Sequence, residues 1–107
     1  MNPPTLQQFK ADLFKAMANP IRIRILEELR LGGGLTVGEL QQRLGVEPSN
    51  VSQHLSIMRS HGLVTSAREG TSVRYTVMAP EIFQLMDVAR ALFENRLLEQ
   101  AKMLEAT

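Results

Sequence analysis

Two short helical patterns, separated by about three residues, constrain the fold of this chain more than any other feature. In residues 36–44, Thr36 precedes Glu39 by three positions, which is the spacing of a capping box at the start of a helix. Gly45 follows and can adopt the left-handed conformation that ends a helix. Residues 48–61 form the second pattern. Two helices joined by so tight a turn predict a helix-turn-helix.

The other patterns predict three further helices and one hairpin. Apolar residues recur at helical spacing over residues 5–17, and again after Asn19, which suits the N-cap of a helix that ends at the glycine run 32–34. Alternating apolar and polar residues predict a hairpin over residues 63–77, with REGTS as its loop. A long helix follows over residues 80–105. The predicted fold class is mainly α, with five helices and a small two-stranded β-hairpin.

The composition is typical of one globular domain. The chain has 107 residues, 44% hydrophobic and 21% charged, which suits a single domain spanning residues 1–107. It contains no cysteine, which excludes disulfides, thiolate catalysis and cysteine-ligated metal. No segment approaches the roughly 20 apolar residues that cross a bilayer, and the first residues lack a signal-peptide pattern. We therefore expect a cytoplasmic protein without a membrane partner.

The last predicted helix carries more apolar surface than a chain of this size can cover. At 1.5 Å per residue it would be roughly 38 Å long. Its apolar stripe contains Ile82, Leu85, Met86, Ala89, Leu92, Phe93, Leu97 and Ala101. The stripe therefore predicts a partner for this helix.

The second helix of the helix-turn-helix has an unusual polar face. Opposite Val51, Leu55 and Met58 it presents short, uncharged hydrogen-bonding side chains and no acid: Ser49, Asn50, Ser52, Gln53 and Ser56. Such groups can read base edges in the major groove, where a carboxylate would be repelled by the phosphates. The hairpin adds Arg68 and Arg74, which are placed to reach the flanking DNA backbone or minor groove. Together these features predict a winged helix-turn-helix that binds double-stranded DNA.

Other classes of function are less well supported by the residues. An enzyme would need a nucleophile beside a base, or a phosphate-binding loop, and the glycine run LGGGLT lacks the lysine and spacing of such a loop. The chain is therefore predicted not to be an enzyme. A winged helix that acts only as a protein–protein adaptor or co-regulator remains the alternative. His54 is interpreted as a half-buried packing residue in preference to a base contact.

Three stretches make the chain resemble the ArsR-type bacterial transcriptional regulators over nearly its whole length. They are FKAMANPIRIRILEEL, VGELQQRLGVEPSNVSQHLSIMRSHGLV and, before the final helix, REGTSVRYTV. The resemblance implies a sequence-specific regulator, expected to be a repressor, that binds an inverted-repeat operator as a homodimer. It also implies that the polar face described above contacts DNA, with Ser49, Ser52 and Gln53 at the positions that contact bases and phosphates.

The same resemblance implies that the homodimer is built from the first and last helices. The apolar residues expected at this two-fold contact are Leu6, Phe9 and Leu13 of the first helix and Leu85, Ala89, Leu92, Phe93 and Leu97 of the last. Each protomer is then expected to place its recognition helix in one of two adjacent major grooves. A second copy of the chain would thus cover the apolar stripe of the last helix.

The sequence departs from the family at both of its common metal sites. Members that sense soft metals carry Cys-Val-Cys where this chain has Thr-Val-Gly at residues 36–38. Members that bind zinc-type metals use an Asp-x-His, then a His and a Glu, on the last helix; here Asp87 matches, but the other positions hold Ala89, Gln100 and Met103. One carboxylate cannot replace four ligands, so no metal site and no cofactor are predicted. Three alternatives are then left open. The chain responds to another ligand or to a metal at a different site, it receives its signal from a separate sensor protein, or it binds DNA constitutively.

Overall fold

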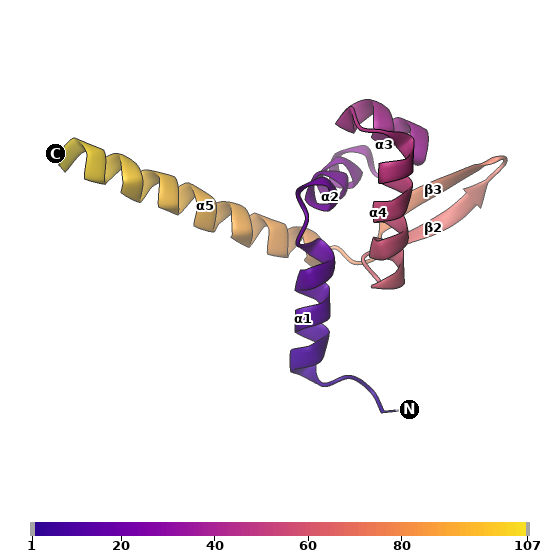
Figure 1. Ribbon diagram of the computed structural model, residues 1–107, viewed down its shortest axis with the longest axis horizontal. Coiled ribbons are helices and arrows are strands. Elements are labelled where there is room, and N and C mark those ends of the chain that lie inside the picture. Colours follow the sequence, from indigo (N-terminus) through magenta and orange to yellow (C-terminus); the bar gives the residue numbers. More distant parts are fainter. Residues whose placement is uncertain (1, 107) are drawn as a thin grey trace.

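The computed structural model describes residues 2–106 and arranges five helices and three strands within them (Figure 1). In chain order the elements are α1 (Leu6–Met17), α2 (Pro20–Gly32), β1 (Leu35–Thr36), α3 (Val37–Leu44), α4 (Pro48–Ser60), β2 (Val64–Glu69), β3 (Ser72–Val77) and α5 (Glu81–Ala106). The five helices predicted from the sequence are present, and the winged helix-turn-helix fold class is confirmed. Helices α3 and α4 form the helix-turn-helix, and β2 with β3 forms the wing.

The starts of α2 and α3 are set by the capping residues that the sequence predicts. The Asn19 side chain accepts hydrogen bonds from the N–H groups of Ile21 and Arg22, at 2.9 and 3.2 Å. Thr36 and Glu39 form a reciprocal capping box. The Thr36 hydroxyl accepts from the Glu39 N–H at 3.2 Å, and the Glu39 carboxylate accepts from the Thr36 N–H at 3.3 Å. These bonds satisfy backbone donors that have no partner inside the helix.

The turn between α3 and α4 depends on Gly45. Its φ of 69° lies in the left-handed region, where a side chain would be strained, and its N–H donates to the Gln41 carbonyl at 2.8 Å. The chain therefore turns sharply after α3, and α4 can begin at Pro48, whose ring suits the first helical position.

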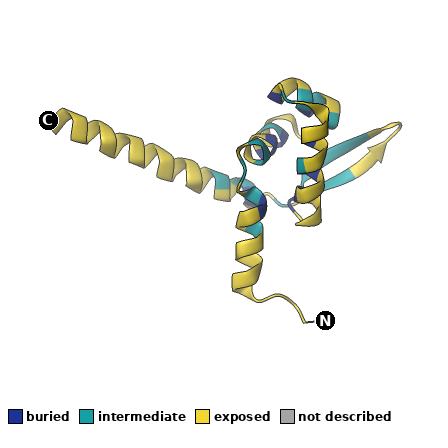
Figure 2. Ribbon diagram, viewed as in Figure 1, coloured by how far each residue is buried: buried dark blue, intermediate teal, exposed yellow. Residues whose placement is uncertain are grey.

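The hydrophobic core lies between α2, α3, α4 and the sheet (Figure 2). Its fully buried members come from all of these elements and the residues that join them: Ile25, Leu26, Leu29, Leu35, Leu40, Val51, Leu55, Met58, Leu63 and Val64. Burying a side chain of this size stabilises a fold by about 1.5–3 kcal/mol relative to exposure. Among the described residues no polar or charged side chain is buried. The buried contacts that hold the helix-turn-helix are therefore apolar, and polar contacts such as that from Arg24 to the Leu44 carbonyl lie nearer the surface.

The sheet has one strand more than the sequence predicts. Strands β2 and β3 pair antiparallel from Val64↔Val77 to Glu69↔Ser72, so the wing turns through two residues in place of the five-residue loop expected. The short strand β1 pairs with the other edge of β3, in the register Leu35↔Tyr75 and Thr36↔Arg74. Strand β3 is therefore central, and it ties the wing to the chain segment directly before α3.

Helix α5 leaves the rest of the molecule soon after it begins (Figures 1 and 2). Ile82 is its only buried residue within the described chain, whereas Leu92 is 68% exposed and Phe93 62%. We call residues 20–82 the body and residues 83–106 the arm. Helix α1 also projects from the body, and Ala16 is its one buried residue within the part described. No helix in residues 2–106 is long and apolar enough to cross a membrane.

Candidate nucleic-acid interface

Helix α4 separates a buried apolar face from an exposed polar one. Val51, Leu55 and Met58 have no exposed surface, and they hold the helix against the core. The five polar residues predicted to contact DNA are all exposed: Ser49, Asn50, Ser52, Gln53 and Ser56. They lie on the side of the helix away from the buried positions, because residues three and four apart share a helix face. The core thereby orients a row of amides and hydroxyls toward solvent.

The first turn of α4 is open to an anion or a base edge. Glu47 is the N-cap residue, and its side chain makes no capping hydrogen bond. The dipole at such a helix start favours negative ligands, although the Glu47 carboxylate opposes them. A carboxylate in this position can also accept a hydrogen bond from the amino group of cytosine. The acid-free pattern of the helix does not include Glu47, because this residue precedes Pro48.

His54 faces the body and not the polar row. Its Nδ1 lies 3.3 Å from a guanidinium nitrogen of Arg22, whose Nε donates to the Ala16 carbonyl at 2.7 Å. Partial burial, and then the charge of Arg22, lower the pKa of His54 from its ordinary value. Because a guanidinium can only donate, Nδ1 must accept, which leaves the proton of the neutral ring on Nε2. This arrangement agrees with the packing role expected for His54.

The two wing arginines lie in different surroundings. Arg68 is exposed on β2, opposite Val73, and its side chain makes no hydrogen bond or ion pair with other described residues. Arg74 is half-buried on β3, where its Nε donates to the Glu69 carboxylate at 2.8 Å. It also donates to the Gly34 carbonyl at 2.6 Å and lies 3.5 Å from the Glu39 carboxylate. A phosphate contact by either arginine stays a prediction, but only Arg68 is unengaged among the described residues.

Asp87, the residue that matches a metal ligand of the family, is already bound by an arginine side chain. Asp87 accepts two hydrogen bonds from Arg30, at 2.6 and 3.0 Å. The guanidinium also lies over the Phe83 ring, 5.1 Å from its centre. The hydrogen bonds from Arg30 lower the pKa of Asp87. In residues 2–106 no three His, Cys, Asp or Glu side chains form a group that could hold a metal ion.

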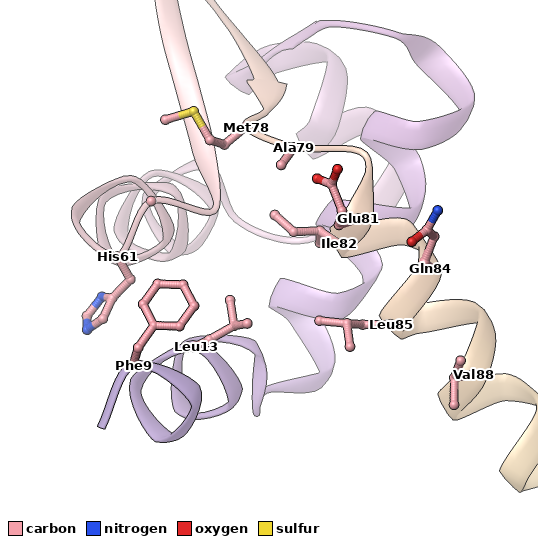
Figure 3. A pocket seen from close by; sticks show the side chains of 11 residues that line it. Phe9, Leu13, His61, Met78, Ala79, Glu81, Ile82, Gln84, Leu85 and Val88 are labelled. Carbon is pink, nitrogen blue, oxygen red and sulfur yellow. The ribbon is translucent and has the colours of Figure 1, made fainter. Parts of the chain in front are cut away.

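An apolar groove of 680 Å³ runs between α1, the end of α4 and the start of α5 (Figure 3). Phe9 and Leu13 line it from α1, and Ile82, Leu85 and Val88 from α5. A second groove, between α2 and α5, contains three further residues predicted at the dimer contact: Ala89, Phe93 and Leu97. Most of the residues predicted to meet a second copy therefore line one of these two grooves.

The fold and the polar helix define a helix-turn-helix protein, and comparison with known proteins agrees. The family model described as a helix-turn-helix domain matches residues 17–67. The uncharacterized HTH-type transcriptional regulator Rv0081 of Mycobacterium tuberculosis (strain ATCC 25618 / H37Rv) is 40% identical over 106 residues, which cover 98% of this chain and 92% of that protein. The crystal structure of M. tuberculosis Rv0081 matches with a TM-score of 0.79 and 39% identity, over 92% of this chain and 99% of that one.

Two other relatives carry more specific names. The transcriptional activator HlyU of Vibrio cholerae is 41% identical over 81 residues, which cover 76% of this chain and 74% of that protein. The crystal structure of the transcriptional repressor PagR of Bacillus anthracis matches with a TM-score of 0.71 and 31% identity, over 78% of this chain and 94% of that one. The chain belongs to the ArsR-type family of helix-turn-helix transcriptional regulators, whose members bind DNA and are not enzymes.

Proposed function

We propose that this chain, as a single winged-helix domain, binds an inverted-repeat DNA operator as a homodimer and represses transcription from it. The observation that carries the proposal is the exposed, acid-free row of amides and hydroxyls on α4, above a fully buried apolar face. Gln53 and Asn50 have the amide geometry that suits the N6 and N7 atoms of adenine. Ser49, Ser52 and Ser56 have hydroxyls that can serve either bases or phosphates.

In this proposal the wing contacts the phosphate backbone of the DNA, and this contact does not depend on the base sequence. Arg68 is exposed and unengaged among the described residues, so its charge is available to a phosphate without loss of an intramolecular partner. Such a contact strengthens specific and non-specific binding alike and makes affinity fall with salt.

The homodimer is formed by α1 and α5. Its support is the exposed apolar surface on these helices, which includes Leu6 and Phe9 on α1 and Leu92, Phe93 and Leu97 on α5. A two-fold axis would bring each apolar surface against its own copy, which is the commonest form of protein dimer. Two recognition helices in one dimer then require two half-sites about 10 bp apart or slightly more.

Neither common metal site of the family is used for sensing. This part of the proposal is supported by the intramolecular partners of the two candidate positions: Thr36 caps α3, and Asp87 is bound by Arg30. Calorimetric titration with zinc, nickel, cadmium and arsenite should therefore give only weak binding, through incidental histidine and carboxylate groups. A stoichiometric site of submicromolar affinity would contradict it.

The decisive test is binding to the DNA upstream of the chain's own gene. Footprinting should reveal an imperfect inverted repeat, and fluorescence anisotropy should give an affinity about 10³-fold or more above that for scrambled DNA. A transcription assay on the same template should show repression. Equal binding to both DNAs, or none, would favour the protein–protein adaptor; transcription raised by bound protein would make the chain an activator, as HlyU is named.

A further inference from the structure

Arg74 lies on the central strand β3 and connects three other segments of the chain. Its guanidinium donates to Glu69 on β2 at 2.8 Å and to the carbonyl of Gly34, between α2 and β1, at 2.6 Å. The same group lies 3.5 Å from Glu39 in the first turn of α3. One side chain therefore joins the wing, the linker before β1 and the first helix of the helix-turn-helix.

The backbone around Arg74 is fitted to its side chain. Arg74 pairs with Thr36 across β1 and β3. A Cβ added to Gly34 would lie 3.2 Å from Cγ and Cδ of Arg74 and 3.1 Å from a methyl carbon of Thr76. Both distances are shorter than ordinary van der Waals contacts. Gly34 thus allows the linker to approach the aliphatic part of Arg74 closely enough to receive its hydrogen bond.

The acceptors around Arg74 compete with any phosphate. Its side chain is 36% exposed, and it contacts two carboxylates and one carbonyl. Glu39 is itself held by the capping box, because its carboxylate also accepts from the backbone and hydroxyl of Thr36. A phosphate that took Arg74 would leave Glu69 and Glu39 close to an added negative charge, without their cation. A phosphate bound by Arg68 would separate no carboxylate from its cation, because Arg68 has no such partner among the described residues.

We infer that Arg74 is a positioning residue that sets the orientation of the wing relative to α3 and α4, and that it does not contact phosphate. In place of the contact predicted from the sequence, Arg74 acts through Arg68, which it places against the DNA backbone. The inference rests on the proposed DNA binding for this last step, but the orientation of the wing is a property of the free protein.

The first test measures the free protein, without DNA. Residual dipolar couplings of backbone amides report the orientation of β2 and β3 relative to α4. Arg74→Ala should change the couplings of the wing relative to those of α4, and Arg74→Lys should not restore them, since one ammonium cannot replace the planar fork of donors. Arg68→Ala is the matched control, which removes the same charge from the neighbouring strand, and should leave the couplings as in the wild type.

The second test is a double-mutant cycle on operator DNA at several salt concentrations. Arg68→Ala should reduce the slope of log affinity against log salt by about 1 per half-site. The double variant Arg68→Ala/Arg74→Ala should lose no more slope and no more affinity than Arg68→Ala alone. Two independent phosphate contacts would instead reduce the slope by about 2 per half-site.

Unchanged couplings in Arg74→Ala, or additive slopes in the double variant, would overturn the inference. If Arg74 instead contacted a phosphate, Arg74→Lys would keep the wild-type slope of log affinity against log salt, because a phosphate accepts hydrogen bonds from an ammonium as well as from a guanidinium. If the wild-type protein binds no DNA at all, the proposed function fails, and the couplings still decide whether Arg74 orients the wing.

Discussion

The body and the arm both carry apolar side chains at helical spacing, but only the body buries them. In α2 and α4, residues such as Leu26 and Leu55 have no exposed surface. In the arm, Leu92, Phe93 and Leu97 are 68%, 62% and 49% exposed. The apolar stripe is similar in the two regions, and the difference lies in what is available to cover it.

This difference shows what a hydrophobic pattern encodes. Helical spacing of apolar residues indicates that one face of a helix will be removed from water, but it does not indicate by which surface. In the body the covering surface belongs to the same chain, on the sheet and the neighbouring helices. In the arm the described residues leave this face exposed, and large apolar patches on an isolated protein mark sites of association. The experiments below separate the two cases.

The largest effect is expected from an added charge in the arm. Leu92→Glu would place one carboxylate per protomer in the apolar contact of the proposed dimer, where removing a charge from water is costly. We expect the dissociation constant of the dimer to rise by about 100-fold or more, which corresponds to about 2.7 kcal/mol. Sedimentation equilibrium measures the dissociation constant, and circular dichroism should show that the body stays folded.

The matched control for this change is Ala91→Glu. It adds the same charge to an exposed position of the arm, turned about 100° around the helix from Leu92 and away from the stripe. This variant should dimerise as the wild type does. A wild-type chain that sediments as a monomer at micromolar concentration, or a Leu92→Glu chain that remains dimeric, would remove the reason for treating the arm as an interface.

The next effect is expected in the body. Leu26→Ala removes a side chain with no exposed surface and leaves a cavity, which should lower the free energy of unfolding by about 2–5 kcal/mol. Urea unfolding at low and high protein concentration should give the same loss, because the cavity lies within one chain. Leu92→Ala is the comparison variant: its loss should vanish when the protein is diluted below the dissociation constant of the dimer. Equal losses at both concentrations for Leu92→Ala would show that the arm packs within its own chain.

Local signals in the sequence were enough to predict the helices. The capping box of Thr36 and Glu39, the N-cap Asn19 and the left-handed Gly45 all depend on residues within four positions of one another, and all are present in the structure. The polar face of α4 was predicted for the same reason, because helical periodicity alone separates Gln53 from the buried positions.

Contacts between distant residues were not predicted. Strand β1 has two residues, too few for a detectable alternation, and its partner β3 lies about 40 positions later in the chain. The Arg30–Asp87 pair joins residues 57 positions apart. The surroundings of Arg74 depend on both the pairing of β1 with β3 and the short turn of the wing. Charge and spacing could therefore identify Arg74 as a wing cation, but could not identify its partners.

A smaller effect, confined to DNA recognition, is expected from Gln53→Ala. The side chain is exposed on α4, so its loss should change neither folding nor dimerisation. It should cost about 1–3 kcal/mol per half-site on the operator and relax the preference at one base position. Anisotropy titrations with a set of single-base operator variants measure both. Gln8→Ala, an exposed glutamine on α1, is the matched control and should bind as the wild type does. Unchanged affinity and preference in Gln53→Ala would show that this face does not read bases.

The smallest effect is expected where α1 joins the body, at the contact of Ala16, Arg22 and His54. Partial burial and the charge of Arg22 depress the pKa of His54 below about 6.5, the ordinary value for histidine. The unfolded chain therefore binds this proton more readily than the folded chain. The stability contributed by the neutral ring is fully present above the unfolded pKa and is lost as the pH falls toward the folded pKa.

We therefore expect the free energy of unfolding of the wild type to decrease between pH 7.5 and pH 5.5, and to decrease by more than that of His54→Gln. The glutamine side chain can accept a hydrogen bond from Arg22 but does not titrate in this range. Urea unfolding at one fixed protein concentration measures the difference. His61→Gln keeps the His54 contact and serves as the control, which should retain the wild-type dependence if His54 carries it. Parallel pH profiles for the wild type and His54→Gln would mean that the neutral imidazole adds nothing to the junction of α1 with the body, which then depends on the packing of Ala16 and on the hydrogen bond from Arg22 to its carbonyl.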